Sequence, residues 1–249
     1  MKLKLLLIAL FALTSLAGYY PQSFQADVAN DMLEDDHLRR DLHEIIRNNR
    51  KNSYQKARRH LFNELHLKKD QSGASYIKGV YCDKTFTSST PDIGPIGKGR
   101  IPNHEVLNCE HTWPQSKFLR GGQEKVQKGD LHHLFPTDNH ANSVRSSNDF
   151  GEVKNGKPAG RNCSASKSDG HYFEPADYHK GNVARAMFYF AIRYNGKINR
   201  RMEKYLRKWH IEDPVDQDEI ERNNKIHKIQ GNRNPFIDYP QLVAKLKDI

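Results

Sequence analysis

Cysteine is scarce in this chain. Its 249 residues include three cysteines, Cys82, Cys109 and Cys163, which allow at most one disulfide bridge and leave one thiol over. A disulfide-dense scaffold is therefore excluded, although the spacing does not reveal which two cysteines pair. Cys109 stands beside Glu110, and a catalytic thiol with His111 as its base is one hypothesis. We favour a buried structural cysteine, because neighbouring residues on a strand point to opposite faces.

Long apolar segments are also scarce. Beyond the N-terminus, no segment is apolar enough to cross a membrane, and the chain has neither an internal repeat nor a low-complexity tract. At the N-terminus, a short basic segment precedes an apolar run from Leu5 to Leu13 and then small residues, which predicts a signal peptide over residues 1–17. An uncleaved anchor or a buried first helix is the alternative. We expect an exported protein, periplasmic or secreted, with a single domain over residues 18–249.

Acidic residues are outnumbered by basic ones. The chain has 40 Lys and Arg against 30 Asp and Glu, a formal net charge of +10, so a polyanion is the expected partner. Hydrophobic residues at 36% and aromatic residues at 10% are enough for a folded core rather than a disordered chain. A basic excess implies only non-specific attraction, so it leaves nucleic acid open as the partner without requiring it.

Apolar residues recur at helical spacing in four places. The predicted helices are Leu38–Ile46, Tyr54–Leu65 with Ser53 as its cap, Gly181–Asn195, and a segment that runs from Asp216, with Glu219 completing a capping box, to Gly231. Two stretches rich in Ser, Thr, Pro and Gly, residues 85–103 and 151–170, are predicted loops within one domain.

The middle of the chain carries the candidate chemistry. Val106–Trp113 and Leu131–Phe135 are predicted strands, and Thr137–Ser147 is a predicted helix capped by Thr137. In this order of strand, loop, strand and helix, His111 and Asn142 converge on one small cleft. Phosphodiester hydrolysis needs a general base for water, a cation on the phosphate, and positive side chains for the transition state. This region supplies candidates for all three.

Four sequence pieces carry a family resemblance. They are Glu-His-x-x-Pro-Gln-Ser from Glu110, Asp-Leu-His-His-Leu-Phe-Pro from Asp130, Asn-Ser-x-Arg-Ser from Asn142, and Ile-Gln-Gly-Asn-Arg-Asn-Pro-Phe from Ile229. Together they resemble the bacterial endonuclease I family of periplasmic and secreted nucleases, which belongs to the ββα-metal, or His-Me finger, group. The resemblance covers roughly residues 30–240. It implies an α+β fold, a mainly helical single domain around a small ββα-metal catalytic motif.

The resemblance also implies a role for each residue of the central pieces. His111 would be the general base that activates water, and Glu110 and Asn142 would ligate a single Mg²⁺, with Mn²⁺ or Ca²⁺ as alternatives. One carboxylate and one amide suit a hard cation that keeps several waters. An imidazole that is off the metal stays free to accept a proton near pH 7. Adjacent residues with opposite roles require that the strand end or distort at this point.

Other residues match the family pattern with less defined roles. Asp130 and His132 are assigned to support behind the metal ligands, and Arg145 is assigned as a catalytic residue through phosphate contact, or as a brace for the helix. An ordinary structural hydrogen bond is the alternative for each. Lys117 and Arg120 are assigned to nucleic-acid contact. The loop around Arg120 departs from better-known relatives, which carry a Gly-Gly-Arg phosphate clamp there, so the role of Arg120 stays open.

Two other classes of function compete with the nuclease. A zinc hydrolase would draw its ligands from His104, His111, His132, His133, His140, His171 and His179. No spacing among them matches a His-Glu-x-x-His helix or paired Cys sets. A non-catalytic basic nucleic-acid-binding protein would instead stack bases on Trp113, Phe118 and Tyr172.

The sequence favours an exported, Mg²⁺-dependent endonuclease over both. We expect little sequence preference, because nothing in the chain resembles a base-reading helix or tandem fingers, and contacts to backbone phosphate are enough for cleavage. The resemblance implies DNA as the substrate, with RNA also open, and we expect no membrane partner and a monomer.

Overall fold

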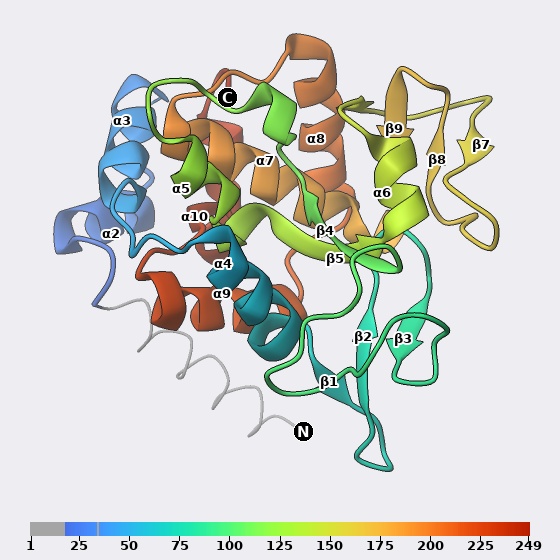
Figure 1. Cartoon of the computed structure of the whole chain (residues 1–249). Coiled ribbons are helices and arrows are strands. Elements are labelled where there is room, and N and C mark those ends of the chain that lie inside the picture. Colours follow the sequence, from blue (N-terminus) through green and yellow to red (C-terminus); the bar gives the residue numbers. More distant parts are fainter. Residues whose placement is uncertain (1–17, 34) are drawn as a thin grey trace, which may run out of the picture.

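Helices make up most of the regular structure of the protein (Figure 1). The computed structural model describes residues 18–33 and 35–249, so the predicted signal peptide, residues 1–17, lies outside the described residues. The helices are α2 (Gln22–Ala29), α3 (Asp35–Ile46), α4 (Tyr54–His60), α5 (Glu124–Lys128), α6 (Asn139–Arg145), α7 (Lys180–Tyr194), α8 (Arg200–Glu212), α9 (Gln217–Gln230) and α10 (Pro235–Asp238). Within the described part of the chain, no helix is long and apolar enough to cross a bilayer.

The strands are short and form three small sheets in the described residues. They are β1 (Lys68–Lys69), β2 (Ser75–Lys78), β3 (Thr85–Thr87), β4 (Leu107–His111), β5 (Leu134–Asp138), β6 (Asp149–Phe150), β7 (Lys157–Pro158), β8 (Lys167–Ser168) and β9 (Tyr172–Glu174). The sheet orders are β1-β2-β3, β4-β5 and β6-β9-β8-β7, and β6 pairs with β9 in parallel. The α+β expectation is confirmed, although the predicted loop 85–103 begins with β3 and the predicted loop 151–170 carries β7 and β8.

The periodic segments fold as helices at the predicted places. Ser53 caps α4 by accepting a hydrogen bond from the Lys56 N–H at 3.3 Å. The helix that begins at Tyr54 changes to a π-helical turn over Leu61–Leu65. Helix α7 ends where Asn195 takes the left-handed conformation, with φ of 53°. Caps therefore fix the start of α4 and the end of α7.

Two details of the sequence-based prediction differ from the structure. Asp216 caps α9 by accepting from the Glu219 N–H at 2.8 Å, but the Glu219 carboxylate binds Arg185 instead of turning back to the cap. The expected reciprocal capping box is therefore only half formed. Helix α8 is absent from the prediction, although its buried residues Met202, Leu206 and Trp209 recur at helical spacing and could have indicated it.

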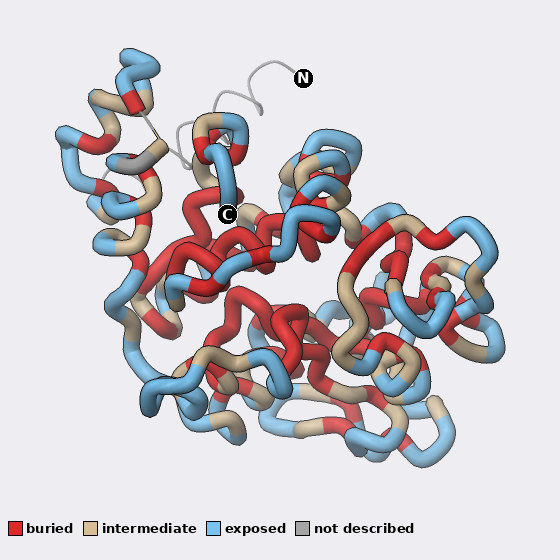
Figure 2. The backbone as a smooth tube through the Cα atoms, turned by 90° about the horizontal axis from the view of Figure 1, so that it is seen from above, coloured by how far each residue is buried: buried red, intermediate tan, exposed pale blue. Residues whose placement is uncertain are grey.

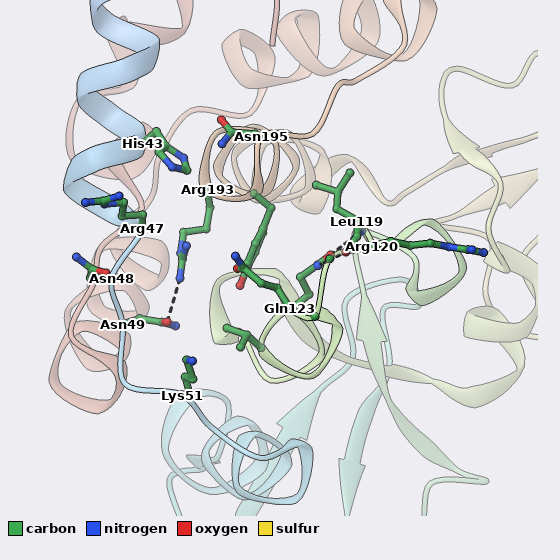
Figure 3. A pocket seen from close by; sticks show the side chains of 15 residues that line it. His43, Arg47, Asn48, Asn49, Lys51, Leu119, Arg120, Gln123, Arg193 and Asn195 are labelled. Atoms are coloured by element: carbon green, nitrogen blue, oxygen red, sulfur yellow. Dashed lines mark hydrogen bonds between the residues drawn. The ribbon is translucent and has the colours of Figure 1, made fainter.

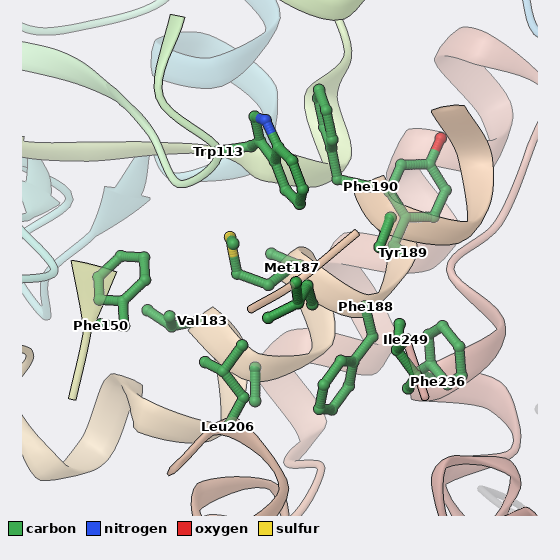
Figure 4. Packing of buried hydrophobic residues seen from close by; sticks show 14 of the residues in the cluster. Trp113, Phe150, Val183, Met187, Phe188, Tyr189, Phe190, Leu206, Phe236 and Ile249 are labelled. Atoms are coloured by element: carbon green, nitrogen blue, oxygen red, sulfur yellow. The ribbon is translucent and has the colours of Figure 1, made fainter. Parts of the chain in front are cut away.

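Helix α7 forms the centre of the larger of two buried clusters. Its side chains are buried on nearly every face, whereas the sequence predicts a single apolar stripe. Trp113 stacks on Phe190 with ring centroids 4.7 Å apart, and Phe188 packs edge-on against Phe236 (Figure 4). Buried segments gather in the interior and exposed turns surround them (Figure 2). Helices α3 and α8 contact α7 and complete this cluster.

The β4–β5 hairpin lies between this cluster and the second one. Leu107, Cys109 and Leu134 pack in the second cluster, together with residues of α4, β2 and β3, while Phe135 packs in the first. Because side chains alternate along a strand, the two faces of the hairpin are buried against different clusters. The end of β4 is consequently held from both sides.

The cysteines pair in one of the three ways that the sequence leaves open. Cys82 and Cys163 form a disulfide, and Cys109 is free and buried. Burial raises the pKa of the Cys109 thiol to about 12, which disfavours the thiolate that a catalytic cysteine needs. The structure thus argues for the structural reading of Cys109 and against the catalytic one.

Candidate active site

A two-stranded hairpin followed directly by a helix builds the candidate site. Strands β4 and β5 pair antiparallel, with Glu110 opposite Phe135 and His111 opposite Leu134. Helix α6 starts immediately after β5, and it packs on both strands. Its N-cap is Asp138, whose carboxylate accepts hydrogen bonds from two backbone N–H groups of the first turn.

Two boundaries predicted for this region are wrong. Thr137 is a buried residue of β5 and does not cap α6. Leu131–His133, predicted as strand, form a 3₁₀ turn, because the Asp130 side chain accepts a hydrogen bond from the His132 N–H and turns the chain. The second strand therefore begins only at Leu134.

Glu110, His111 and Asn142 line one open hollow of about 370 Å³. Glu110 and His111 are the last two residues of β4, so their side chains leave the strand on opposite faces. Asn142 lies in the first turns of α6 and is partly exposed. The hollow is completed by Pro114, Gln115 and Ser116 and by the turn after α6. The structure thus brings together the three residues that the sequence singles out.

The Glu110 carboxylate is buried and held at one oxygen. Its Oε1 accepts a 2.7 Å hydrogen bond from the Tyr81 hydroxyl and lies 3.4 Å from the Arg145 Nε. Its Oε2 has no hydrogen-bond partner among the described residues, and neither does the side-chain amide of Asn142. One carboxylate oxygen and one amide oxygen therefore remain available at the hollow.

The His111 imidazole is held in one orientation by its two neighbours. Its Nε2–H donates to the Lys128 carbonyl oxygen at 3.1 Å, and its Nδ1 accepts a 3.3 Å hydrogen bond from the Gln115 amide. Burial, followed by the effect of the nearby His133, holds the pKa of His111 well below its usual value of about 6.5. The ring is consequently neutral at neutral pH, with Nδ1 as its proton acceptor.

Asp130 and His132 lie in the core and do not contact the three residues at the hollow. The Asp130 carboxylate accepts hydrogen bonds from the hydroxyls of Tyr189 and Tyr194, at 2.9 Å each, and from the Gln230 amide. The His132 ring packs against Tyr189 and donates to a backbone carbonyl. This network joins the turn before β5 to α7 and α9, which favours the structural alternative for Asp130 and His132.

Arg145 is almost fully buried, at 2% exposure. Its Nη1 donates to the backbone oxygens of His111 and Ser146, and its Nη2 donates to that of Thr112 at 2.6 Å. Its guanidinium carbon lies 4.5 Å from the centre of the Phe150 ring. This geometry favours the bracing role for Arg145 over phosphate contact, because the guanidinium ties α6 to the end of β4.

The two side chains predicted to bind nucleic acid lie apart from each other. The Lys117 Nζ forms a 2.7 Å ion pair with Asp149 and lies at a small cavity that shares Pro114 and Arg145 with the hollow. Arg120 is exposed and does not line the hollow of Glu110; it lies at the edge of a second, larger one. Only Lys117 is therefore next to the candidate site.

The residues that support the site were not singled out by the sequence. Tyr81 lies 29 positions before Glu110, and His133, whose ring centre is 5.4 Å from that of His111, directly follows His132. Gln115 belongs to the recognised Glu-His-x-x-Pro-Gln-Ser piece, which was a usable signal. No sequence pattern marks Tyr81, because it reaches Glu110 only through the fold.

The donor atoms at the hollow fit a hard cation better than zinc. A free carboxylate oxygen and a free amide oxygen are the ligand types of Mg²⁺, which keeps waters in its remaining positions. Among residues 18–33 and 35–249, no group of three or more His, Cys, Asp or Glu side chains is placed to hold a metal ion.

The α+β fold places a carboxylate, an imidazole and an amide around one open hollow. This combination of side chains is expected at the active site of a hydrolytic enzyme. The chain belongs to the endonuclease I family, whose model matches residues 35–241.

Three relatives illustrate the family. The chain is 37% identical to an extracellular ribonuclease of Bacillus subtilis (strain 168) over 155 residues, which cover 54% of this chain and 51% of that protein. It is 33% identical to a periplasmic deoxyribonuclease of Aeromonas hydrophila over 190 residues, 66% of this chain and 79% of that protein. An extracellular deoxyribonuclease of the same organism is 33% identical over 173 residues, 68% of this chain and 73% of that protein. The chain spans about half the length of the Bacillus ribonucleases that it matches.

Proposed function

We propose that the protein is an exported, Mg²⁺-dependent endonuclease that hydrolyses the phosphodiester bonds of DNA with little sequence preference. The observation that carries the proposal is the convergence of Glu110, His111 and Asn142 on one open hollow in a chain of the endonuclease I family. A ββα-metal site of this kind is what the resemblance implies for the β4–β5 hairpin and α6. The three side chains have two tasks, metal binding and proton transfer.

Glu110 and Asn142 are the proposed metal ligands. The Tyr81 and Arg145 side chains hold Oε1 of Glu110, which leaves Oε2 to face a cation. When bound, Mg²⁺ supplies positive charge that stabilises the phosphate oxygens and the leaving oxygen. The chain's own contribution is to fix the carboxylate in a buried position before the cation arrives.

His111 is the proposed general base. The Lys128 carbonyl keeps the proton on Nε2, so Nδ1 carries the lone pair toward the hollow. A water molecule that takes the place of the Gln115 amide can transfer its proton to Nδ1 as its oxygen bonds to phosphorus. The bond from phosphorus to the leaving oxygen then breaks, and that oxygen takes a proton from solvent. Because burial keeps the ring neutral, the base is ready at neutral pH without prior deprotonation.

DNA is the proposed substrate, and RNA is a second candidate. The relatives that this chain matches over most of their length are named deoxyribonucleases. The two Bacillus relatives, which it matches over about half of their length, are named ribonucleases. Export rests on the predicted signal peptide and on the extracellular or periplasmic names of these relatives. The monomer remains a prediction that light scattering can test.

The decisive experiment compares the protein from Gly18 onward with its His111→Ala variant on supercoiled plasmid. We expect cleavage by the parent with Mg²⁺ and none with excess EDTA. Loss of a general base costs about 10²–10⁴-fold in rate, while binding of DNA is retained. If neither protein cleaves and both bind, the protein is a basic binding module. Cleavage that survives the substitution would place the base elsewhere.

A further inference from the structure

A second hollow, of about 470 Å³, lies between the end of α3, the loop before α5, and the end of α7 (Figure 3). We call it the α3–α7 hollow. It is lined by His43, Arg47, Asn48, Asn49, Lys51, Leu119, Arg120, Gly121, Gly122, Gln123, Val126, Gln127, Arg193, Tyr194 and Asn195. None of these residues contributes to the hollow of Glu110 and His111.

The lining of the α3–α7 hollow is cationic and contains no carboxylate. Arg47, Lys51, Arg120 and Arg193 contribute four positive charges, and the other polar side chains are mostly amides. Arg47 also forms an ion pair with Glu44 at 2.9 Å, on the solvent side. A hollow with this lining attracts an anion that brings both negative charge and hydrogen-bond acceptors.

Arg193 is the strongest single indication of a ligand. Its side chain is buried, at 6% exposure, yet it has no ion pair among the described residues. Its Nη2 donates to the Asn49 side-chain oxygen at 3.1 Å, and its guanidinium lies over the Tyr194 ring. Its Nε has no partner within the described part of the chain. The buried Asp130 carboxylate compensates this charge only from beyond ion-pair distance. Because burying a charge without a direct partner is costly, a bound anion would supply that partner.

The remaining walls leave room for such a ligand. Lys51 is exposed, and no carboxylate pairs with it in the described residues. Gly121 and Gly122 have φ of 124° and 84°, and a Cβ on either would meet open space. The two glycines let the loop turn at positive φ, and they place no side chain in the hollow. Arg120 lies at the edge, with its guanidinium directed away from Arg193 (Figure 3).

Helix α5 connects the α3–α7 hollow to the candidate active site. Gln127 lines the hollow, and its carbonyl oxygen accepts a 2.7 Å hydrogen bond from His133. The next carbonyl, that of Lys128, accepts from His111. The wall of the α3–α7 hollow and the proposed base are therefore attached to two consecutive residues at the end of α5.

We propose that the α3–α7 hollow is a second phosphate site, which holds a backbone phosphate of the nucleic-acid strand a few nucleotides from the bond that is cut. Arg193 and Lys51 are its main donors. The identity of the ligand rests on the proposed function, but binding can be measured whether or not the protein cleaves.

The test measures binding of labelled single-stranded and duplex oligonucleotides in the His111→Ala background. Lys51→Gln and Arg193→Gln should each weaken binding by about tenfold, as expected for the loss of one charged hydrogen bond. Each should also reduce the slope of log affinity against log salt, by about 0.7 for single strands and 0.9 for duplex. Lys154→Gln is the matched control, because Lys154 is an exposed lysine in the loop before β7 and does not line the hollow.

Oligonucleotides of increasing length test where the site lies, and inorganic phosphate tests whether its ligand is a free anion. The variants should bind a dinucleotide as the parent does, and the difference should grow over the next few nucleotides. If Lys51→Gln binds long oligonucleotides like the Lys154→Gln control, the proposal is overturned. It is also overturned if the Lys51→Gln and Arg193→Gln variants lose binding of inorganic phosphate but bind oligonucleotides as the parent does. The ligand of the hollow would then be a free anion. Failure of the parent to cleave would overturn the nuclease proposal alone.

Because Arg193→Gln removes a buried side chain, its thermal unfolding is compared with that of the parent. The exposed Lys51→Gln variant carries the decision if Arg193→Gln does not fold.

Discussion

Tyr81 donates a 2.7 Å hydrogen bond to Oε1 of Glu110, the carboxylate that we propose as a metal ligand. Both side chains are buried, and the hydrogen bond leaves only Oε2 facing the hollow. The phenol therefore decides how the carboxylate is oriented.

Tyr81→Phe should weaken metal binding by about 10–100-fold, because it removes a partner that orients a ligand. The Mg²⁺ concentration for half-maximal cleavage should rise accordingly, and Mn²⁺ binding measured by calorimetry should weaken in parallel. Tyr178→Phe is the control, since Tyr178 is exposed and does not line the hollow of Glu110. An unchanged Mg²⁺ requirement in Tyr81→Phe would argue against Glu110 as a ligand held by this bond.

Arg145→Met should destabilise the fold by about 3–5 kcal/mol, because it leaves the buried Glu110 carboxylate without its cation and three backbone oxygens without a donor. Urea unfolding measures this change, with the exposed Arg161→Met as its control. A variant that keeps its stability but loses affinity for DNA would instead assign Arg145 to phosphate contact.

Stability should fall as the pH drops below about 6.5. Burial lowers the pKa of His132 and His179 to about 3 and that of His133 to about 4, whereas the unfolded chain binds protons near 6.5. The unfolded state therefore binds more protons between these values, and each group costs up to about 1.4 kcal/mol per pH unit. Their stabilising contribution is complete above about 6.5 and is lost progressively toward pH 3–4.

Urea midpoints at pH 7, 6 and 5 test this dependence. His179→Gln should reduce the slope by about one proton, and the exposed His171→Gln should not change it. A flat profile over this interval would mean that these rings are not held neutral by the fold.

Removal of the disulfide should cost about 2–5 kcal/mol, since Cys82 and Cys163 close a long loop with a sequence separation of 81. Dithiothreitol should lower the melting temperature of the parent and of Cys109→Ala, but not that of the Cys82→Ala/Cys163→Ala double variant. Equal sensitivity of all three would show that the reductant acts through something other than this bridge.

The sequence predicted the helices where periodicity and caps agree, as at Ser53 and Asn195. It also predicted that His111 and Asn142 meet, because the end of a strand and the helix after the next strand are adjacent in space whatever the exact boundaries are, whereas Glu110 was added by the family resemblance. Local chain geometry was enough for these elements.

Long-range contacts could not be read in the same way. Asp130 and His132 belong to a recognisable piece of sequence, but Tyr189 and Tyr194 on α7 draw the Asp130 carboxylate into the core. Tyr81 is the converse case, since its contact with Glu110 exists only after β2, β3 and the hairpin have packed. Spacing along the chain carries no information about either contact.

The placement of the β4–β5 hairpin between two buried clusters has a consequence for how the protein loses function. The amide protons of this hairpin can exchange with solvent only when one of the clusters opens, so hydrogen exchange there should require free energies close to that of global unfolding. Glu110 and His111 lie on this hairpin rather than in a loop. Heat and denaturant should therefore abolish the geometry of the site at the same midpoint as the fold, with no inactive but folded intermediate in between.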